Sequence, residues 1–129
     1  MRPNWLYKIP AVLYSGLIFA LSSSSLEEAP KIEIYGFDKL VHSLEYIVYG
    51  MTLMLALTTS RSERLRRNAA LLAIIIGILF AASDELHQYF VPGRHCSLFD
   101  LLADSIGVVA GVWIYQTNSL LRRIGRSSG

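Results

Sequence analysis

Four long apolar segments constrain this chain more than any other feature of its sequence. They run over residues 5–21, 40–58, 68–90 and 98–116. Each has close to the ~20 residues that a helix needs to cross the hydrocarbon core of a bilayer. The third contains residues 69–82, a run without a single charge, and none of the four shows the two-residue alternation of a strand. The pattern predicts four transmembrane helices.

The composition of the chain supports the same class. Only 17% of the residues are charged, against about 25% in soluble domains. A length of 129 residues fits a single domain over residues 1–129. We therefore expect an all-α, polytopic membrane protein whose four helices pack as a small bundle.

The first apolar segment admits a second interpretation. Arg2 and Lys8 precede an apolar stretch that ends in the small residues of positions 20–25, as in a cleaved signal peptide. Lys8 and Pro10 lie early in the segment, where a spanning helix tolerates a snorkelling lysine and a first-turn proline. We favour the spanning helix.

The charged residues are distributed unevenly across the predicted membrane. With four spans, the amino end, the loop 60–67 and the carboxyl tail lie on one side. That side holds nine of the twelve lysines and arginines: Arg2, Lys8, Arg61, Arg64, Arg66, Arg67, Arg122, Arg123 and Arg126. Nine of the ten acidic residues lie towards the other side, and Glu63 is the exception. Because basic loops stay in the cytoplasm, both termini are predicted to be cytoplasmic.

Three polar clusters are predicted to reach the extracytoplasmic side at a similar depth. They are Asp38, His42 and Glu45 in the second segment, Asp84, His87 and Gln88 in the third, and Asp100 and Asp104 in the fourth. Residues three or four apart share one face of a helix. Gly107 and Gly111 continue the face of the last cluster, and small residues at this spacing let membrane helices approach closely. The sequence therefore predicts a three-sided polar pocket.

Several of these residues also have a purely structural interpretation. Asp38 and Asp100 could each serve only as a helix N-cap, and both histidines could be satisfied polar residues at helix contacts. Glu85 points away from Asp84 on a helix and could be solvated. Asp104 lies a turn deeper, where an unpaired carboxylate costs several kcal/mol, so a role in a site or network is favoured.

Two cations lie near the predicted pocket. Arg94 follows the Pro92-Gly93 break, and we expect it to bridge the carboxylates. Glu45 is expected to pair with Arg94 or with Lys39.

The same residues indicate whether a metal ion, a cofactor or a nucleic acid is expected to bind. His42-x-x-Glu45 and Asp84-x-x-His87 each place a carboxylate and a histidine at a spacing that builds metal sites in helix bundles. Lys39 and Arg94 lie close by and oppose a metal ion, so we predict no metal and no cofactor, with a bound divalent metal as the alternative. The single cysteine, Cys96, excludes an internal disulfide framework, and the absence of a basic arm argues against a nucleic-acid partner.

At these residues the chain resembles the VanZ-like family of bacterial membrane proteins. The matching pattern is Asp38-Lys39-x-x-His42-x-x-Glu45-Tyr46, then Asp84-Glu85-x-His87-Gln88-x-Phe90-x-Pro92-Gly93-Arg94, then Asp100-x-x-x-Asp104-x-x-Gly107-x-x-x-Gly111. The likeness covers nearly the whole chain, although family members often carry asparagine at the position of Asp104. It implies a multi-pass protein of the bacterial cytoplasmic membrane with a role in the cell envelope. Through the member that gives the family its name, it also implies a link to resistance against the glycopeptide teicoplanin, but no agreed reaction.

Three hypotheses for the function follow. In the first, the pocket binds a membrane lipid or the headgroup of a lipid-linked envelope precursor. Its ligand-binding residues would be Asp38, Lys39, Glu45, Glu85, Gln88, Arg94, Asp100 and Asp104. In the second, an intramembrane transferase or hydrolase uses a histidine that a carboxylate orients, and either Asp84 with His87 or Asp38 with His42 could supply this pair. Its catalytic residues would be His42, His87 and Asp84. In the third, the ion pairs only lock the bundle, although buried ion pairs are weak sources of stability. The sequence predicts no oligomeric state.

Overall fold

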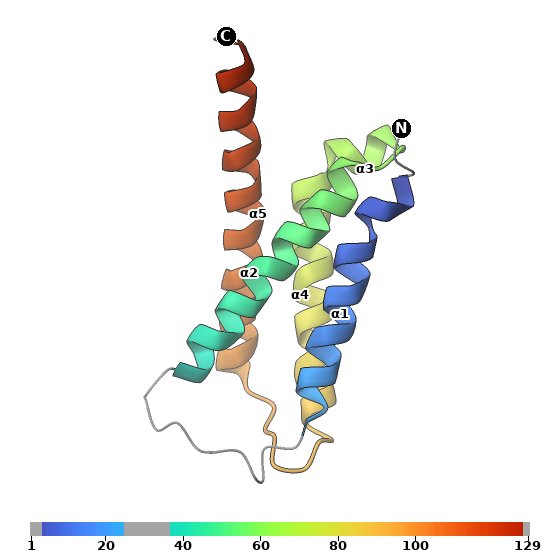
Figure 1. Ribbon diagram of the computed structural model, residues 1–129. Helices are drawn as coiled ribbons and strands as arrows, with labels where there is room; N and C mark the ends of the chain where they lie inside the picture. Colours follow the sequence, from blue (N-terminus) through green and yellow to red (C-terminus); the bar gives the residue numbers. More distant parts are fainter. Residues whose placement is uncertain (1–3, 25–36, 128–129) are drawn as a thin grey trace.

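The computed structural model describes residues 4–24 and 37–127 and shows no strand in these two ranges. A 3₁₀ turn, η1 (Asn4–Tyr7), leads into α1 (Ile9–Ser22), and α2 (Phe37–Thr58), α3 (Glu63–Arg67), α4 (Ala69–Gln88) and α5 (Leu98–Ser127) follow (Figure 1). Four stretches are long and apolar enough to span a membrane: Asn4–Ser22, Phe37–Thr58, Ala69–Gln88 and Leu98–Arg122. The predicted all-α fold with four transmembrane helices is confirmed.

The ends of the helices differ from the predicted ones for local reasons. Pro10 lies in the first turn of α1, where its missing N–H removes no helical hydrogen bond. α4 ends at Gln88, two residues early, because the chain then turns through Pro92 and Gly93. Gly93 has a φ of 78°, and the Arg94 N–H donates to the Val91 carbonyl at 3.1 Å, which closes a turn that favours glycine at its third position.

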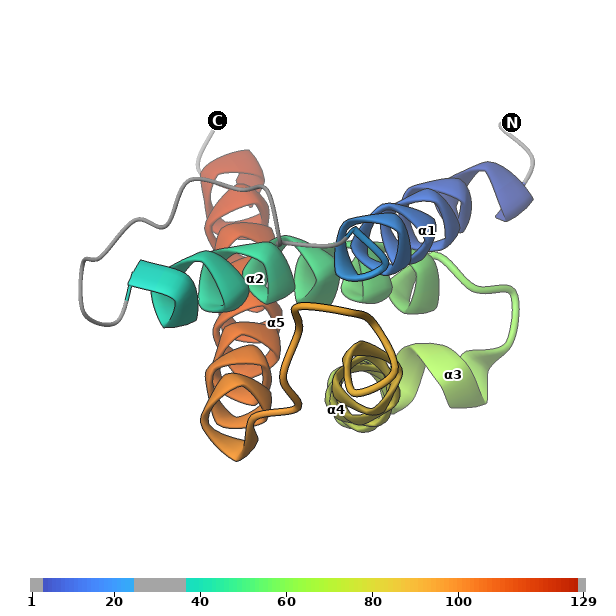
Figure 2. The same ribbon diagram turned by 90° about the horizontal axis from the view of Figure 1, so that it is seen from below.

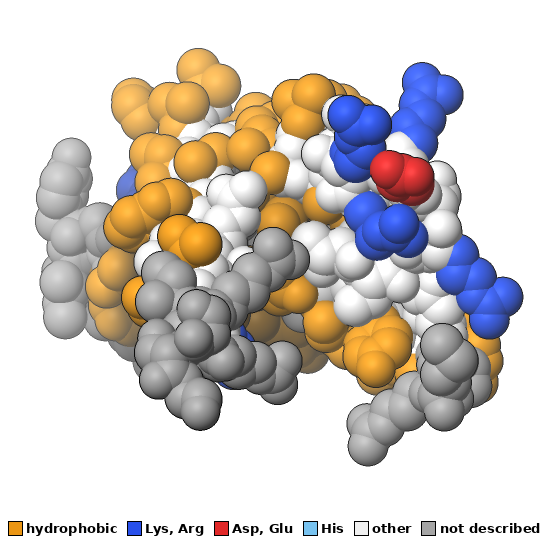
Figure 3. Space-filling model, turned by 90° about the horizontal axis from the view of Figure 1, so that it is seen from above, with side chains coloured by type: hydrophobic (Ala, Val, Ile, Leu, Met, Phe, Trp, Pro, Cys, Tyr) orange, Lys and Arg blue, Asp and Glu red, His pale blue; other side chains and the backbone are white. Residues whose placement is uncertain are grey.

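Two further features lie at the end of the bundle that holds α3. α3 is a short helix that the sequence did not predict, and the Ser62 hydroxyl caps it by accepting from the Leu65 N–H at 3.5 Å. α5 continues well past residue 116 and extends beyond the other helices at the α3 end (Figure 1). Basic side chains surround one acidic side chain on this face (Figure 3), where the α2–α4 link carries four arginines and Glu63.

α2 is the central helix of the bundle, because α1, α4 and α5 all pack against it. It runs obliquely across the others, and the view along the bundle shows α1 and α4 on either side of it (Figures 1 and 2). The core between these helices holds Tyr46, Ile18 and Val108, which are almost completely buried. Large apolar residues such as Leu79, Leu86 and Trp113 stay exposed on the outside, where a bilayer would cover them.

Glycines allow α2 and α5 to touch through their backbones. A Cβ added at Gly107 would collide with the Ser43 carbonyl, and one at Gly111 would collide with the Ile47 carbonyl. At Gly50, on the facing helix, a Cβ would lie 2.6 Å from the Val108 carbonyl oxygen. The predicted close approach at Gly107 and Gly111 is therefore real, and it brings the first turns of α5 against α2.

Candidate functional site

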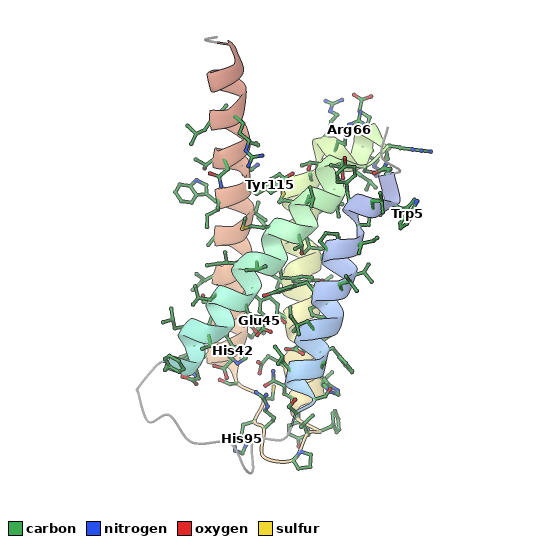
Figure 4. The ribbon with its side chains drawn as sticks, viewed as in Figure 1. Trp5, His42, Glu45, Arg66, His95 and Tyr115 are labelled. Carbon is green, nitrogen blue, oxygen red and sulfur yellow. The ribbon has the colours of Figure 1, made fainter. Side chains whose placement is uncertain are left out.

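The three predicted polar clusters meet at the end of the bundle opposite α3. In Figure 4, His42 and Glu45 lie in this half of the molecule and His95 lies beyond them, whereas Arg66 and Trp5 lie at the other end. Four polar side chains here are buried, each with at most 3% of its surface exposed: Asp84, Glu85, Gln88 and Asp104. Such burial of carboxylates requires partners or a ligand.

The deepest pair joins His42 on α2 to Asp104 on α5. The His42 Nδ1 and Asp104 Oδ1 atoms are 3.1 Å apart, with the histidine side chain 15% exposed and the aspartate fully buried. The second carboxylate oxygen of Asp104, Oδ2, has no hydrogen-bond partner within the described ranges. Asp104 therefore orients the imidazole. The helical spacing had instead suggested Asp38 as the partner of His42, or no specific partner at all.

Asp38 holds Lys39 instead of His42. Lys39 Nζ lies 2.5 Å from Asp38 Oδ2 and 2.7 Å from Asp100 Oδ1. Because α2 begins at Phe37, Asp38 lies in the first turn of the helix, where the positive end of the helix dipole stabilises its negative charge. The lysine thus links the amino ends of α2 and α5.

Asp84 and His87 do not form the predicted pair. Asp84 Oδ2 accepts from the Tyr46 hydroxyl at 3.5 Å and from Gln88 Nε2 at 3.3 Å. His87 turns towards α1, where its Nε2 lies 3.0 Å from the Ser23 hydroxyl and its ring stacks on Phe19 at 4.4 Å. A spacing of three residues leaves their side chains about 60° apart around the helix, so the two contact different neighbours.

Glu85 is buried rather than solvated. Its Oε2 accepts a hydrogen bond from the Ser97 backbone N–H at 2.8 Å, just before α5 begins. The Ser97 hydroxyl in turn accepts from the Asp100 N–H at 3.3 Å. Glu85 therefore fixes the start of α5 against the end of α4, while its Oε1 has no partner among the residues that the structure describes.

Arg94 does not bridge the carboxylates, so this prediction was wrong for the described part of the chain. Its Nη2 donates to the Leu21 carbonyl at 2.8 Å and its Nε to the Ser24 carbonyl at 3.2 Å. It adds a second donor to the Leu21 carbonyl, which also accepts from the Ser24 N–H at 3.2 Å, and so ties the α4–α5 loop to the end of α1. Glu45 also lacks the expected ion pair in residues 4–24 and 37–127, and its Oε1 is buried without a partner.

A cavity of about 340 Å³ opens among these side chains. It is lined by Asp38, Lys39, His42, Gln88, Gly93, Arg94, His95, Ser97 and Asp100. His95 and Ser97 were not predicted to belong to the site, because both lie in the α4–α5 loop, where helical spacing gives no signal. Tyr46 was also missed as a site residue, although it closes the first motif of the family pattern.

The arrangement has three chemical capabilities. Lys39 and Arg94 offer N–H donors to an anion, and the carboxylates accept from hydroxyl groups. His42, held by Asp104, has the orientation of a general base. His42, Glu85 and Asp100 each bring one potential metal-ligand atom within 4.8 Å of the other two.

Comparison with known proteins places the chain in a family. A search of the curated proteins found no match, and neither did a search of the solved structures. The model of the VanZ/LLP1 family matches residues 3–122, which is nearly the whole chain and includes all three polar clusters. This protein therefore belongs to the VanZ/LLP1 family.

Proposed function

We propose that this protein, in the bacterial cytoplasmic membrane, binds the phosphate- and sugar-bearing headgroup of a lipid-linked envelope precursor or glycolipid. The observation that carries the proposal is the cavity of about 340 Å³, which Lys39, Arg94 and the two carboxylates of Asp38 and Asp100 help to line. It lies at the ends of spanning helices, at the depth where lipid headgroups meet water.

The residues of the cavity suit both parts of such a headgroup. Arg94 uses Nε and Nη2 on the carbonyls of α1, and a guanidinium has five N–H donors in total, so the rest remain for a phosphate. Lys39 adds a second positive charge. The acidic excess around them disfavours a bare anion but suits sugar hydroxyls, which donate to carboxylates such as Asp38 and Asp100.

The sidedness of the cavity follows from the charges. The α3 end carries the arginines of the α2–α4 link, and the cavity lies at the opposite end. By the positive-inside rule the cavity faces outwards. A headgroup of the outer leaflet would then reach it without crossing the membrane. If the bound lipid is a wall precursor, altered tolerance to glycopeptides is the expected phenotype.

Arg94 and Arg66 provide a matched pair for the test. Arg66 Nη1 donates to the Ser60 and Arg61 carbonyls at 2.9 and 3.2 Å, so both arginines bind backbone carbonyls, but only Arg94 lines the cavity. We expect native mass spectrometry of Arg66→Gln to show the same co-purified lipid as the parent protein. Arg94→Gln and Lys39→Gln should each lose most of it.

Two outcomes would reject the binding proposal. One is that no phosphate- or sugar-bearing lipid co-purifies with the parent protein and none is retained when a polyprenyl-phosphate sugar is added in nanodiscs. The other is that Arg66→Gln and Arg94→Gln lose the lipid equally, because the loss would then come from reduced folding.

The His42–Asp104 contact favours one alternative, an intramembrane transferase or hydrolase acting on the same class of lipid. A buried carboxylate that holds Nδ1 keeps Nε2 available as the base. In that case the parent protein should convert the bound lipid to a product, His42→Gln should stop this, and lipid retention should persist. Retention without any product supports binding alone.

A further inference from the structure

We propose that His42, Glu85 and Asp100 form a binding site for a divalent transition-metal ion, of which Mn²⁺ and Zn²⁺ are the best candidates. The three residues come from α2, α4 and α5, and their ligand atoms lie within 4.8 Å of one another. A metal ion between them would therefore tie together the three helices that form the polar end. The proposal does not depend on headgroup binding.

His42 is already oriented as a metal ligand. Its Nδ1 lies 3.1 Å from Oδ1 of the fully buried Asp104, and in the tautomer whose Nδ1–H donates to this carboxylate the lone pair on Nε2 is free for a metal. Metal-binding histidines generally donate their other ring N–H to a carboxylate or carbonyl in this way.

Glu85 is a buried carboxylate that is only half satisfied. Glu85 is only 2% exposed. Its Oε2 accepts a hydrogen bond from the Ser97 N–H at 2.8 Å, whereas its Oε1 has no partner in the described ranges. A buried carboxylate oxygen without a partner is costly. A metal ion bound to Oε1 would satisfy it.

The two cations near the cluster, Arg94 and Lys39, do not prevent a metal ion from binding. Arg94 is turned to the carbonyls of α1 and takes no part in the cluster. Lys39 lies 2.7 Å from Asp100 Oδ1, with 38% of its side chain exposed, so it can swing into solvent when a metal binds. Lys39 therefore competes with the metal ion for Asp100, and removing the lysine should strengthen metal binding.

The ligand set and the cavity suggest what kind of ion binds. One imidazole with two carboxylates suits Mn²⁺ or Zn²⁺ better than Mg²⁺ or Ca²⁺, which prefer oxygen ligands alone. His42 and Asp100 also line the cavity, so the remaining coordination positions face it. Three protein ligands with open positions are typical of metals that also bind an exchangeable ligand.

The test uses the full chain in nanodiscs after treatment with a chelator. Mn²⁺ binding is followed by the loss of the free-ion electron paramagnetic resonance signal, and Zn²⁺ binding by native mass spectrometry. We expect one ion per chain, retained in excess Mg²⁺. Glu85→Gln and Asp100→Asn should each weaken binding by more than about 10-fold, and Asp104→Asn, which acts behind His42, by about 10- to 100-fold.

Lys39→Gln and Glu45→Gln make the test specific. Removing the competing lysine should tighten Mn²⁺ binding by about 10-fold, the order of magnitude that one nearby unit charge contributes close to a protein surface. Glu45 is another carboxylate of this end with a buried oxygen that lacks a partner, but it is not one of the three ligands, so Glu45→Gln should change the affinity far less than Glu85→Gln.

Circular dichroism and gel filtration first establish which variants fold. If Glu85→Gln does not fold, Asp100→Asn and Lys39→Gln decide the matter. The proposal is overturned if the parent protein binds neither Mn²⁺ nor Zn²⁺ at one equivalent, or if Lys39→Gln fails to tighten binding. It is also overturned if Glu45→Gln weakens binding as much as the ligand variants, because the ion would then respond only to the diffuse acidic charge.

Discussion

The two ends of the bundle are both polar, but they are built in different ways. At the α3 end, polar side chains bind backbone groups close to them in sequence, as Arg66 does with Ser60 and as Ser62 does with Leu65. At the opposite end the partners are distant: His42 contacts Asp104, and Arg94 contacts Leu21. Contacts at the first end are mostly local, apart from the hydroxyls of Tyr115 on α5 and Thr58 on α2, which lie 3.1 Å apart, whereas the second end exists only when α1, α2, α4 and α5 are packed together.

The difference also concerns what is left unsatisfied. Within the described residues, the side chains of Glu45, Asp84, Glu85 and Asp104 each have a buried carboxylate oxygen without a hydrogen-bond partner, all at the cavity end, whereas the α3 end has one such amide oxygen, that of Asn4. The charged side chains of the α3 helix are exposed to solvent. A network kept only for stability would be expected to satisfy its buried groups. The incomplete end is therefore the one expected to bind something.

The first prediction tests whether the two ends face opposite compartments. Cys96, the single cysteine, is exposed in the α4–α5 loop. A membrane-impermeant maleimide should label it fully in spheroplasts. The double variant Cys96→Ser, Leu65→Cys moves the thiol to α3 and should be labelled only after the membrane is permeabilised. Labelling in the reverse order would invert the topology and place the cavity in the cytoplasm.

The second prediction separates the two ends by stability. Gly111→Leu would force a side chain against the Ile47 carbonyl and should lower the free energy of unfolding by about 3 kcal/mol, the upper end of the usual cost of overpacking. Hydrogen exchange should rise in residues 37–46 and 98–108 and stay unchanged in residues 60–68. Equal loss of protection at both ends would contradict the distinction.

Gly16→Leu is the matched control for this substitution. A Cβ at Gly16 meets nothing within 4 Å, so the longer side chain should point into lipid. We expect its free energy of unfolding to stay within about 0.5 kcal/mol of the parent value.

The helices could be predicted from the sequence because the hydropathy of a segment depends only on its own residues. A run such as residues 69–82 determines a spanning helix whatever its neighbours are. The five residues of α3 escaped prediction because so short a helix depends on the Ser62 cap rather than on apolar periodicity. The length of α5 was underestimated because its last turns lie beyond the apolar segment.

The position of the site could be predicted, but its pairings could not. Helical spacing correctly grouped the polar residues at one end, yet the partners it offered, Asp38 for His42 and Asp84 for His87, are not the ones that the structure shows. Spacing places a side chain on a face and does not choose between partners on different helices. The long side chain of Arg94 illustrates the same limit, since it reaches the end of α1 instead of the nearby carboxylates.

The third prediction compares one tyrosine from each end. The Tyr46 hydroxyl donates to Asp84 inside the network, whereas the Tyr115 hydroxyl lies 3.1 Å from the Thr58 hydroxyl. Tyr46→Phe should cost about 1 kcal/mol, because the buried Asp84 carboxylate loses a donor at 3.5 Å and keeps the one from Gln88. Tyr115→Phe should cost less than about 0.5 kcal/mol, since Thr58 also donates to the Met54 carbonyl. Equal costs in reversible chemical unfolding would show that the network adds nothing beyond ordinary hydrogen bonds.

The smallest effect is expected from the two arginines that bind carbonyls. Arg94→Gln removes a tether between segments more than 70 residues apart, from Arg94 to Leu21, and should cost about 1 kcal/mol. Arg66→Gln removes contacts within one short loop and should cost about 0.5 kcal/mol or less, because an exposed local contact restricts the unfolded chain little. Denaturation in the same detergent measures both values. If Arg66→Gln proves the more costly, the α3 end also carries tertiary structure, and the contrast between the two ends lies only in their charge.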